Sequence, residues 1–387
     1  MEQTTFHKSF QTIGLIGLVV GLGLMFGTGS FTAQSVFYGW VFWTCVTFGF
    51  FSLSVLHHMT KGSWGYPIRR LLEAGSHPLM MLVFAIPILL IAFNIGGWLD
   101  VLYPEWAPGP GEGEHMLGAQ KLAFLQKGFP IMTVATFAVF IAMSHFSIKW
   151  QKNLDDTGDE KWLRRLTNWN SGFFPVFVLF INFSITFWVM SMKPHWYSTI
   201  YGIWFLVQQG LVALAIIAII VGTQAKKEPF NKVVTREFTK DIGNLMLALT
   251  LLWAYFSFSQ YLIIWSANLP EFIGYYLDRR EGGFENLGAL LVGFGFFVPF
   301  LLLLSPKMKR EPKRLAVIGV VILVIRVLDM HYNVAPMFRT NVMPQLGDMG
   351  ALLAFGGLWC VLFSYFVTKA PLLVKQQPQL KEAIDHA

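Results

Sequence analysis

An arginine and an aspartate near the end of a long apolar stretch are the residues best placed to do chemistry. Arg326 follows Lys313 by 13 residues, which is roughly 20 Å along a helix at 1.5 Å per residue. Asp329 comes three residues later on the same side of that helix and can pair with Arg326. Because ionisable side chains inside a membrane are rare and usually functional, the two residues form either part of a proton route or a buried ion pair. His331, at the outer interface, can extend such a route.

Polar side chains also lie at the ends of other apolar stretches. Five of them fall at outer ends, and they suit either a quinol headgroup or ordinary contact with interfacial water: Ser257, Gln260, Asn268, Glu271 and His195. Glu73 and His145 lie at inner ends, where they can form a proton half-channel. No acidic residue or histidine bridges the middle, so the sequence does not predict a complete proton wire.

The redox ligands in the sequence argue against an electron carrier within this chain. A membrane b-type haem needs two histidines that face each other inside the bilayer, whereas the nine histidines lie at span ends, in loops or at the termini. Cys45 and Cys360 lie in separate apolar stretches and cannot hold an iron–sulfur cluster. We therefore predict no bound cofactor, no metal site and no catalytic residue in this chain.

Ten apolar stretches must position these residues. They run over about 10–30, 36–56, 78–96, 128–148, 172–190, 199–222, 243–265, 286–304, 314–332 and 347–368. Each approaches the roughly 20 residues that cross a bilayer as a helix. With 55% hydrophobic and 13% charged residues, the chain is predicted to be an all-α integral membrane protein. We expect one polytopic domain over 1–373, with four-helix bundles over about 36–190 and 199–332, one flanking helix at each end, and a cytoplasmic tail over 374–387.

Lysine and arginine residues are concentrated on one side of these stretches. The N-terminus, the even-numbered loops and the C-terminus carry 22 of the 29, and six lie on the opposite side. Since cytoplasmic loops carry the excess of lysine and arginine, both termini are predicted to be cytoplasmic. The same bias explains the net charge of +7, so this charge gives no support for nucleic-acid binding. The partner that the apolar spans imply is membrane lipid.

Two local patterns predict how helices pack and begin. Residues 66–75 predict a short interfacial helix that ends at Gly75, and Ser76 is expected to cap the next span. The first apolar stretch has the small-xxx-small spacing that lets helices approach closely, at Gly17 with Gly21 and at Gly23 with Gly27.

Two segments resemble a known family. They read MSMKPHWYSTIYG at residues 190–202 and AYFSFSQYLIIWSANLPEFIGYYL at residues 254–277. Together with the ten-span plan over nearly the whole chain, they resemble the ActF subunit family of bacterial alternative complex III, a quinol:electron acceptor oxidoreductase. The resemblance implies two four-helix bundles related to the membrane anchors of polysulfide reductase. Many relatives carry an acidic residue just before the tryptophan that corresponds to Trp188, but Phe187 stands there in this chain, so no role of that carboxylate is transferred.

The resemblance also implies partners that hold the redox centres. These are a pentahaem cytochrome c subunit, an iron–sulfur subunit, a monohaem cytochrome c subunit and a sister ten-helix subunit regarded as the main quinol site. Menaquinol or ubiquinol would be the substrate of the complex. We therefore expect a haem-free subunit in the bacterial cytoplasmic (inner) membrane that provides scaffolding and proton half-channels. Two alternative hypotheses are a quinol-binding anchor of a polysulfide- or nitrite-reductase complex and a secondary transporter.

Overall fold

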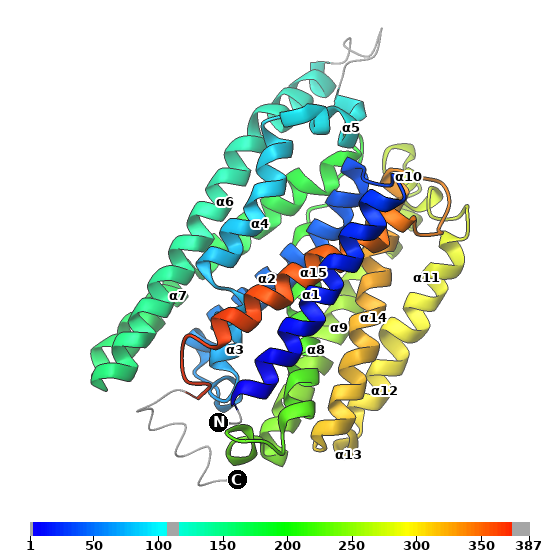
Figure 1. The fold of residues 1–387 in the computed structure, drawn as a ribbon. Coiled ribbons are helices and arrows are strands. Elements are labelled where there is room, and N and C mark those ends of the chain that lie inside the picture. The colour runs from blue at the N-terminus through cyan, green and yellow to red at the C-terminus, as the bar shows by residue number, and fades with distance from the viewer. Residues whose placement is uncertain (1–2, 107–115, 374–387) are drawn as a thin grey trace.

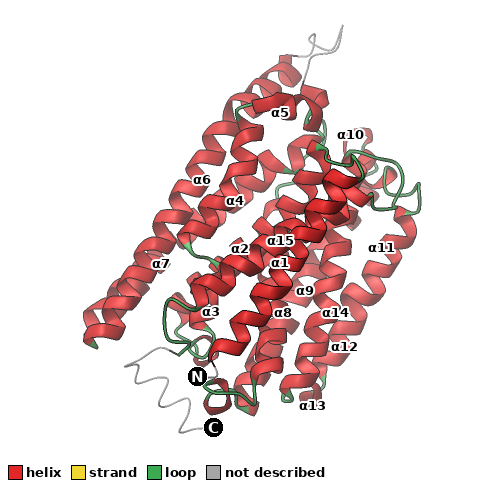
Figure 2. Ribbon diagram, in the orientation of Figure 1, coloured by secondary structure: helices red, strands yellow, loops and turns green. Residues whose placement is uncertain are grey.

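The computed structural model describes residues 3–106 and 116–373, and every regular element within these ranges is a helix (Figure 2). Within the described residues, ten helical segments are long and apolar enough to cross a membrane. This confirms the predicted all-α, multi-pass architecture. Most spans consist of one long helix: α1 (Gln3–Gly27), α2 (Ala33–Thr60), α6 (Met116–Thr157), α7 (Glu160–Trp188), α8 (Tyr201–Gln224), α9 (Arg236–Ala267), α14 (Pro312–Val334) and α15 (Leu346–Val367).

Two spans are interrupted, and short helices fill several loops. The third span combines α3 (Arg69–Gly75) with α4 (Pro78–Ala92), and the eighth joins α11 (Phe284–Val292) to α12 (Val298–Leu304) through a π-helix over Gly293–Phe297. The loop helices are α5 (Trp98–Leu102), α10 (Pro270–Leu277) and α13 (Pro306–Lys309), with 3-10 turns at Ser63–Gly65, Ile95–Gly97, Pro104–Trp106, Met190–Met192, Phe230–Lys232 and Ala335–Met337. The predicted tail over 374–387 lies outside the described residues.

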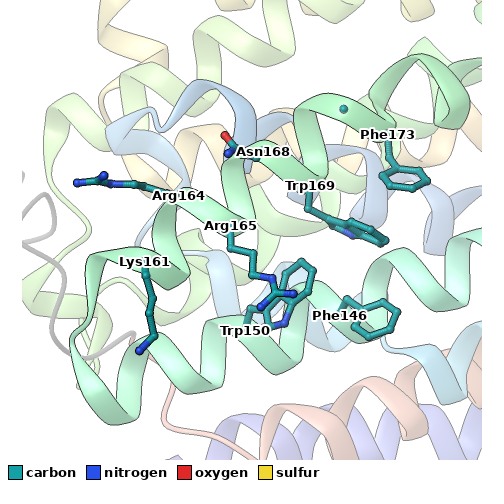
Figure 3. A pocket seen from close by; sticks show the side chains of 9 residues that line it. Phe146, Trp150, Lys161, Arg164, Arg165, Asn168, Trp169 and Phe173 are labelled. Atoms are coloured by element: carbon teal, nitrogen blue, oxygen red, sulfur yellow. The ribbon is translucent and has the colours of Figure 1, made fainter.

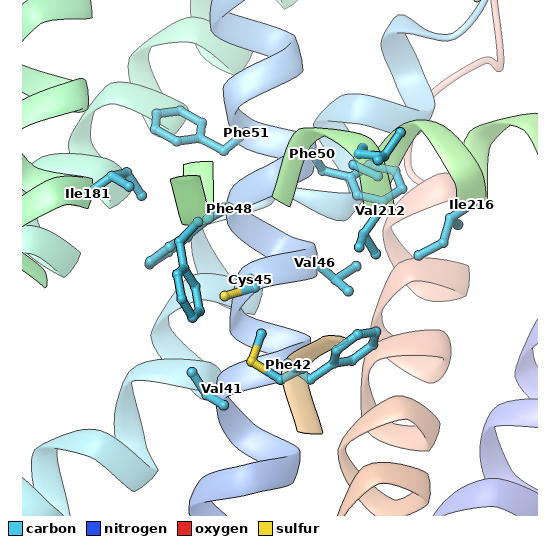
Figure 4. Packing of buried hydrophobic residues seen from close by; sticks show 14 of the residues in the cluster. Val41, Phe42, Cys45, Val46, Phe48, Phe50, Phe51, Ile181, Val212 and Ile216 are labelled. Carbon is cyan, nitrogen blue, oxygen red and sulfur yellow. The ribbon is translucent and has the colours of Figure 1, made fainter. Parts of the chain in front are cut away.

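Helices α2 and α8 form the centre of the molecule. In their most apolar windows, 83% of the α2 residues and 89% of the α8 residues are buried, against 17% for α1. Helix α2 contacts α4, α7, α8 and α15, and α8 also packs along α14. Figure 4 shows the side chains that fill this region, among them Phe48 and Phe51 of α2 and Val212 of α8. Helices that are apolar on all faces are expected at such central positions.

The other helices surround this pair in two groups (Figure 1). Helices α4, α6 and α7 stand on one side of α2, whereas α9, α11, α12 and α14 stand on the side of α8. Helices α1 and α15 pack against each other along their length and lie across α2. The start of α1 and the end of α15 lie at the same end of the molecule, as an even number of crossings requires. The cytoplasmic orientation of that end stays a prediction.

Glycines bring α1 and α15 together along part of the predicted pattern. A Cβ atom added at Gly21 would overlap the backbone of Ala354, and one added at Gly14 would lie 2.8 Å from the carbonyl oxygen of Gly357. Gly17 also faces α15, so the first small-xxx-small pair is confirmed. The second pair, Gly23 with Gly27, packs against no other helix in the described part of this chain, because a Cβ at either position meets nothing within 4 Å there.

We expect the substitution Gly21→Val to loosen α1 from the rest of the protein. The added methyl groups must displace the backbone of α15, and overpacking of this kind destabilises proteins by about 1–3 kcal/mol. Thermal unfolding of the detergent-solubilised chain measures the loss. Gly23→Val is the matched control, since the same side chain enters open space there. Equal melting temperatures for the two variants would contradict the assigned contact.

The junction of α3 and α4 differs from the sequence prediction at its cap. The short helix forms and ends at Gly75 as predicted, but the cap of α4 is His77, whose Nδ1 accepts a hydrogen bond from the backbone N–H of Leu79 at 3.3 Å. Ser76 instead donates to the carbonyl oxygen of Leu72 at 2.8 Å. Its hydroxyl therefore satisfies the end of α3 and is not free to begin α4.

Candidate functional site around Asp329 of α14

The Asp329 carboxylate is the centre of a buried hydrogen-bond network. Its Oδ2 atom lies 2.9 Å from Nη1 of Arg326, one turn earlier on α14. The same oxygen accepts hydrogen bonds from Nε2 of Gln208 on α8 at 2.7 Å and from Nε1 of Trp253 on α9 at 2.9 Å. Arg326 and Asp329 are each only 1% exposed. The carboxylate thus ties three helices together while it neutralises a buried cation.

The Arg326 guanidinium has two further contacts. It lies over the ring of Trp253, with 3.9 Å from its Cζ to the ring centroid. Its Nη2 atom donates to the carbonyl oxygen of Gly295, 3.3 Å away. Gly295 belongs to the π-helix between α11 and α12, and a Cβ atom there would lie only 2.6 Å from Nη2. π-helices of this kind are frequent at functional sites, and the missing side chain of this glycine gives the cation access to a backbone carbonyl.

A second layer of polar groups extends the network toward the C-terminal end of α14. Asn333 donates from Nδ2 to Oδ1 of Asp329 at 3.3 Å and to its backbone oxygen at 2.8 Å. The Tyr275 hydroxyl of α10 donates to Oδ1 of Asn333 at 2.9 Å. Burial raises the pKa of Tyr275 to about 12 and also raises the pKa of Tyr276 above its ordinary value. Both phenols therefore stay neutral and able to donate at physiological pH.

Arg279 closes this layer from the loop after α10. Its guanidinium donates to the carbonyl oxygens of Tyr332 at 3.1 Å, Asn333 at 3.0 Å and Tyr275 at 2.5 Å. It also lies 3.5 Å from the centroid of the Tyr275 ring. Two of these carbonyls belong to the last turn of α14, where the helix dipole favours a positive charge. The C-terminal end of α14 is therefore held by a buried cation.

A pocket of about 730 Å³ opens next to this network. Its walls come from α8, α9, α10, α11, α14 and the π-helix, and its inner wall includes Trp253, Tyr275, Arg279 and Asp329, all of which are buried. Its rim includes side chains that are more than half exposed, namely Phe258, Val292 and Phe297. Since these lie on membrane-spanning segments, the pocket leads from the lipid-facing surface to the buried carboxylate.

The five outer polar residues that the sequence suggested are not all at this pocket. Ser257 lines it and donates to the backbone oxygen of Trp253 at 2.7 Å. Gln260 is not among the pocket-lining residues. It is buried, and its side-chain oxygen accepts a hydrogen bond from Ser198 at 3.0 Å. The other three are exposed residues outside the pocket lining: Asn268, which ends α9, Glu271, in the first turn of α10, and His195.

His331 points away from the Asp329 network. Residues two apart on a helix do not share a face, and Nε2 of His331 lies 2.7 Å from the carbonyl oxygen of Val342 in the loop before α15. Its ring also packs edge-on against Tyr38 of α2. A role for His331 in proton movement stays a prediction.

Glu73 and His145 lie at the other end of the molecule, and they are not in contact with each other in the described part of the chain. Glu73 is bound to Arg70, with Oε2 2.5 Å from Nη1, and Arg70 also pairs with Asp155 of α6. His145 is exposed on α6 beside Phe146. Glu73 therefore belongs to a closed ion cluster, and its use in a proton half-channel stays a prediction.

Several residues of the pocket have no counterpart in the sequence prediction. Trp253, Tyr261 and Trp265 of α9 line it together with Ser257. They recur every four residues along α9, so a polar and aromatic stripe on one helix face was the signal that could have revealed them. Arg279 and Tyr332 gave no such signal, because their positions depend on how α10 folds back over α14.

The described residues contain no group of three or more His, Cys, Asp or Glu side chains placed to hold a metal ion. The pocket offers aromatic surfaces, neutral donors and one carboxylate. Among the residues that the structure describes, Asn333 is the one side chain that donates to Oδ1 of this carboxylate, which leaves an acceptor position on that oxygen. Such a lining suits a flat amphipathic ring with hydroxyl groups. No protein-family model matches this chain, and its sequence matches no curated protein.

Proposed function

We propose that this chain is a haem-free membrane subunit of a respiratory quinol oxidoreductase of the alternative complex III type, in the bacterial cytoplasmic membrane. The observation that carries the proposal is the lipid-accessible aromatic pocket beside Asp329. One wall of that pocket comes from residues 254–277, which are one of the two segments that resemble the ActF family. This segment contributes seven lining residues: Ala254, Ser257, Phe258, Tyr261, Trp265, Tyr275 and Tyr276.

In this proposal the pocket receives the ring of a quinol from the bilayer. The ring stacks against the aromatic lining, and one hydroxyl donates to the acceptor position left on Oδ1 of Asp329. The isoprenoid tail leaves over the exposed side chains of Phe258, Val292 and Phe297, which already face lipid. These contacts use the apolar body and polar ends of the ligand as small-molecule sites commonly do.

Oxidation of the quinol releases two electrons and two protons, and the electrons pass to partner subunits. The proposed partners are those implied by the family resemblance: pentahaem and monohaem cytochrome c subunits, an iron–sulfur subunit and a sister ten-helix subunit. If the sister oxidises the quinol, this chain is chiefly a scaffold. The pocket supports quinol binding by this chain itself within the complex. The same pocket would also fit the second candidate function, a quinol-binding anchor of a polysulfide- or nitrite-reductase complex.

Purification from native membranes tests the assignment to a respiratory complex. A tag on this chain should recover subunits with the absorption of c-type haem, together with quinol-dependent reduction of an added electron acceptor. A colourless preparation that contains only this chain would contradict the assignment.

Filling the pocket tests quinol binding separately. Ala254→Phe places a ring inside the pocket, and the bound quinone extracted per purified complex should then fall by the share that this chain holds, while any quinone on the sister subunit remains. Leu251→Phe is the matched control, because this exposed residue lies one turn earlier on α9 and does not line the pocket. An intact haem-containing complex with unchanged quinone content in Ala254→Phe would leave the scaffold function standing and reject the quinol site.

A further inference from the structure

A second, more open groove of about 880 Å³ lies at the far end of the α6–α7 hairpin (Figure 3). One part of its lining is aromatic, with Phe146 and Trp150 from α6 and Trp169 and Phe173 from α7. The other part is basic, with Lys161, Arg164 and Arg165 from the first two turns of α7. The groove belongs neither to the Asp329 network nor to the proposed quinol pocket.

The two parts of the groove fall at different depths along the hairpin. Arg165 is the last charged residue of α7 before a run over 166–192 without Asp, Glu, Lys or Arg. On α6 the corresponding run ends at Lys149. Tryptophans are enriched where such runs meet the headgroup layer, and Trp150 and Trp169 occupy that level. The aromatic part therefore lies at the edge of the hydrocarbon, and the basic part lies at the headgroups.

The basic part carries an excess of positive charge. Lys161 pairs with Asp159 at 2.7 Å and Arg164 with Glu160 at 3.4 Å, and the side chains of both pairs are strongly exposed. Exposed pairs contribute little to stability, so either cation can turn to another anion. Arg165 forms no ion pair with any described residue, and its guanidinium lies 4.6 Å from the centroid of the Trp150 ring. It is the cation left for an external anion.

A glycine keeps the apolar part of the groove open. Gly172 lines the groove on α7, and a Cβ atom added there would meet nothing within 4 Å. Gly172 lies one turn beyond Asn168 and two turns beyond Arg165 on α7, and together with Trp169 and Phe173 it leaves a shallow apolar surface there. An amphiphile with an anionic head and a hydrocarbon chain fits both parts at once, because charge and apolar surface follow each other along the same helix.

We propose that this groove is a binding site for an anionic phospholipid. Its phosphate binds Arg165, with Arg164 and Lys161 beside it, and an acyl chain lies over Gly172 between Trp169 and Phe173. A free phosphate ion would make the same contact with Arg165. Only a lipid would also contact Gly172.

Lipid retention in two variants of the full-length chain tests the proposal. The protein is purified in a mild detergent, supplied with phosphatidylglycerol or phosphatidylethanolamine, and the bound lipid is counted by native mass spectrometry. Arg165→Gln should lower phosphatidylglycerol binding about fivefold, the factor that one basic side chain contributes near an anionic surface, with little effect on phosphatidylethanolamine. Gly172→Leu should lower the binding of phosphatidylglycerol without a change of charge. Leucine is also the better helix former, so this variant is expected to fold.

Two controls isolate the groove. Arg314→Gln removes an exposed arginine from the start of α14, and Gly23→Leu fills open space on α1, and both should bind lipid as the unmodified chain does. An equal loss of phosphatidylglycerol in Arg165→Gln and Arg314→Gln would overturn the proposal, because it would show a general charge effect. Displacement of the lipid by millimolar inorganic phosphate, with normal lipid binding in Gly172→Leu, would overturn it in favour of a free-anion site.

Discussion

Replacement of Asp329 by asparagine is expected to destabilise the protein by about 3–5 kcal/mol, the usual range for a buried charge that loses its partner. Asparagine keeps an oxygen that can accept hydrogen bonds from Gln208 and Trp253, so the variant removes the negative charge with little change of shape. Arg326 then stays buried without a compensating anion. Lower yield and a lower midpoint of thermal unfolding in detergent would record the loss.

Two further variants separate this effect from general damage. Arg326→Gln combined with Asp329→Asn removes both charges and should recover much of the lost stability. Asp278→Asn is the surface control, since the side chain of Asp278 is 36% exposed in its pair with Lys193 and such pairs contribute little. Wild-type yield and turnover in Asp329→Asn would exclude both the ion pair and the proton route as functions of these residues.

The spanning helices could be predicted because the bilayer restricts backbone structure so strongly. A chain segment in lipid must satisfy its own hydrogen bonds, so a long apolar run specifies a helix. The same restriction singled out Arg326 and Asp329, which stand in such a run without nearby solvent. Their spacing of three residues implied that they could meet, and they do. The residues of other helices that donate to Asp329, Trp253 and Gln208, could not be predicted. A single sequence does not show which helices are neighbours.

The pocket illustrates the same limit. Ser257 was picked for its polarity at the end of a span and does line the pocket, whereas Glu271 and Asn268 met the same criterion and lie outside it. Position along the membrane normal can be estimated from hydropathy, but the direction in which a side chain points around the bundle depends on tertiary packing. The π-helix that lets Arg326 reach the Gly295 carbonyl is also a tertiary feature, and only the glycines of 293–297 hint at it.

Buried arginines are compensated differently at the two ends of the molecule. At the C-terminal end of α14, Asp329 balances Arg326 while the helix backbone holds Arg279. At the other end, Arg70 binds two carboxylates, Glu73 on its own helix and Asp155, which is 85 residues away in sequence. Arg69 adds a second cation 3.8 Å from Glu73, so this cluster is neutral overall. We infer that this neutral cluster stabilises the contact between α3 and α6. Removal of one of its charges tests this inference.

The substitution Arg70→Gln should destabilise the protein by about 3–5 kcal/mol, because two buried carboxylates then share Arg69 alone. The side chains of Glu73 and Asp155 are only 9% and 7% exposed, so water cannot replace the lost cation. Thermal unfolding in detergent again measures the effect. Adding Asp155→Asn to this variant should restore stability, since Arg69 and Glu73 remain as a balanced pair.

The exposed pair of Arg164 with Glu160 provides the comparison for Arg70. Both are arginine–glutamate pairs within one helix, but the side chains of Arg164 and Glu160 are 77% and 79% exposed. Arg164→Gln should therefore change the free energy of unfolding by less than about 1 kcal/mol. If Arg70→Gln were no more destabilising than Arg164→Gln, or if Asp155→Asn made Arg70→Gln worse, the cluster would not be held by charge balance. The contact of α3 with its neighbours would then depend on apolar packing alone.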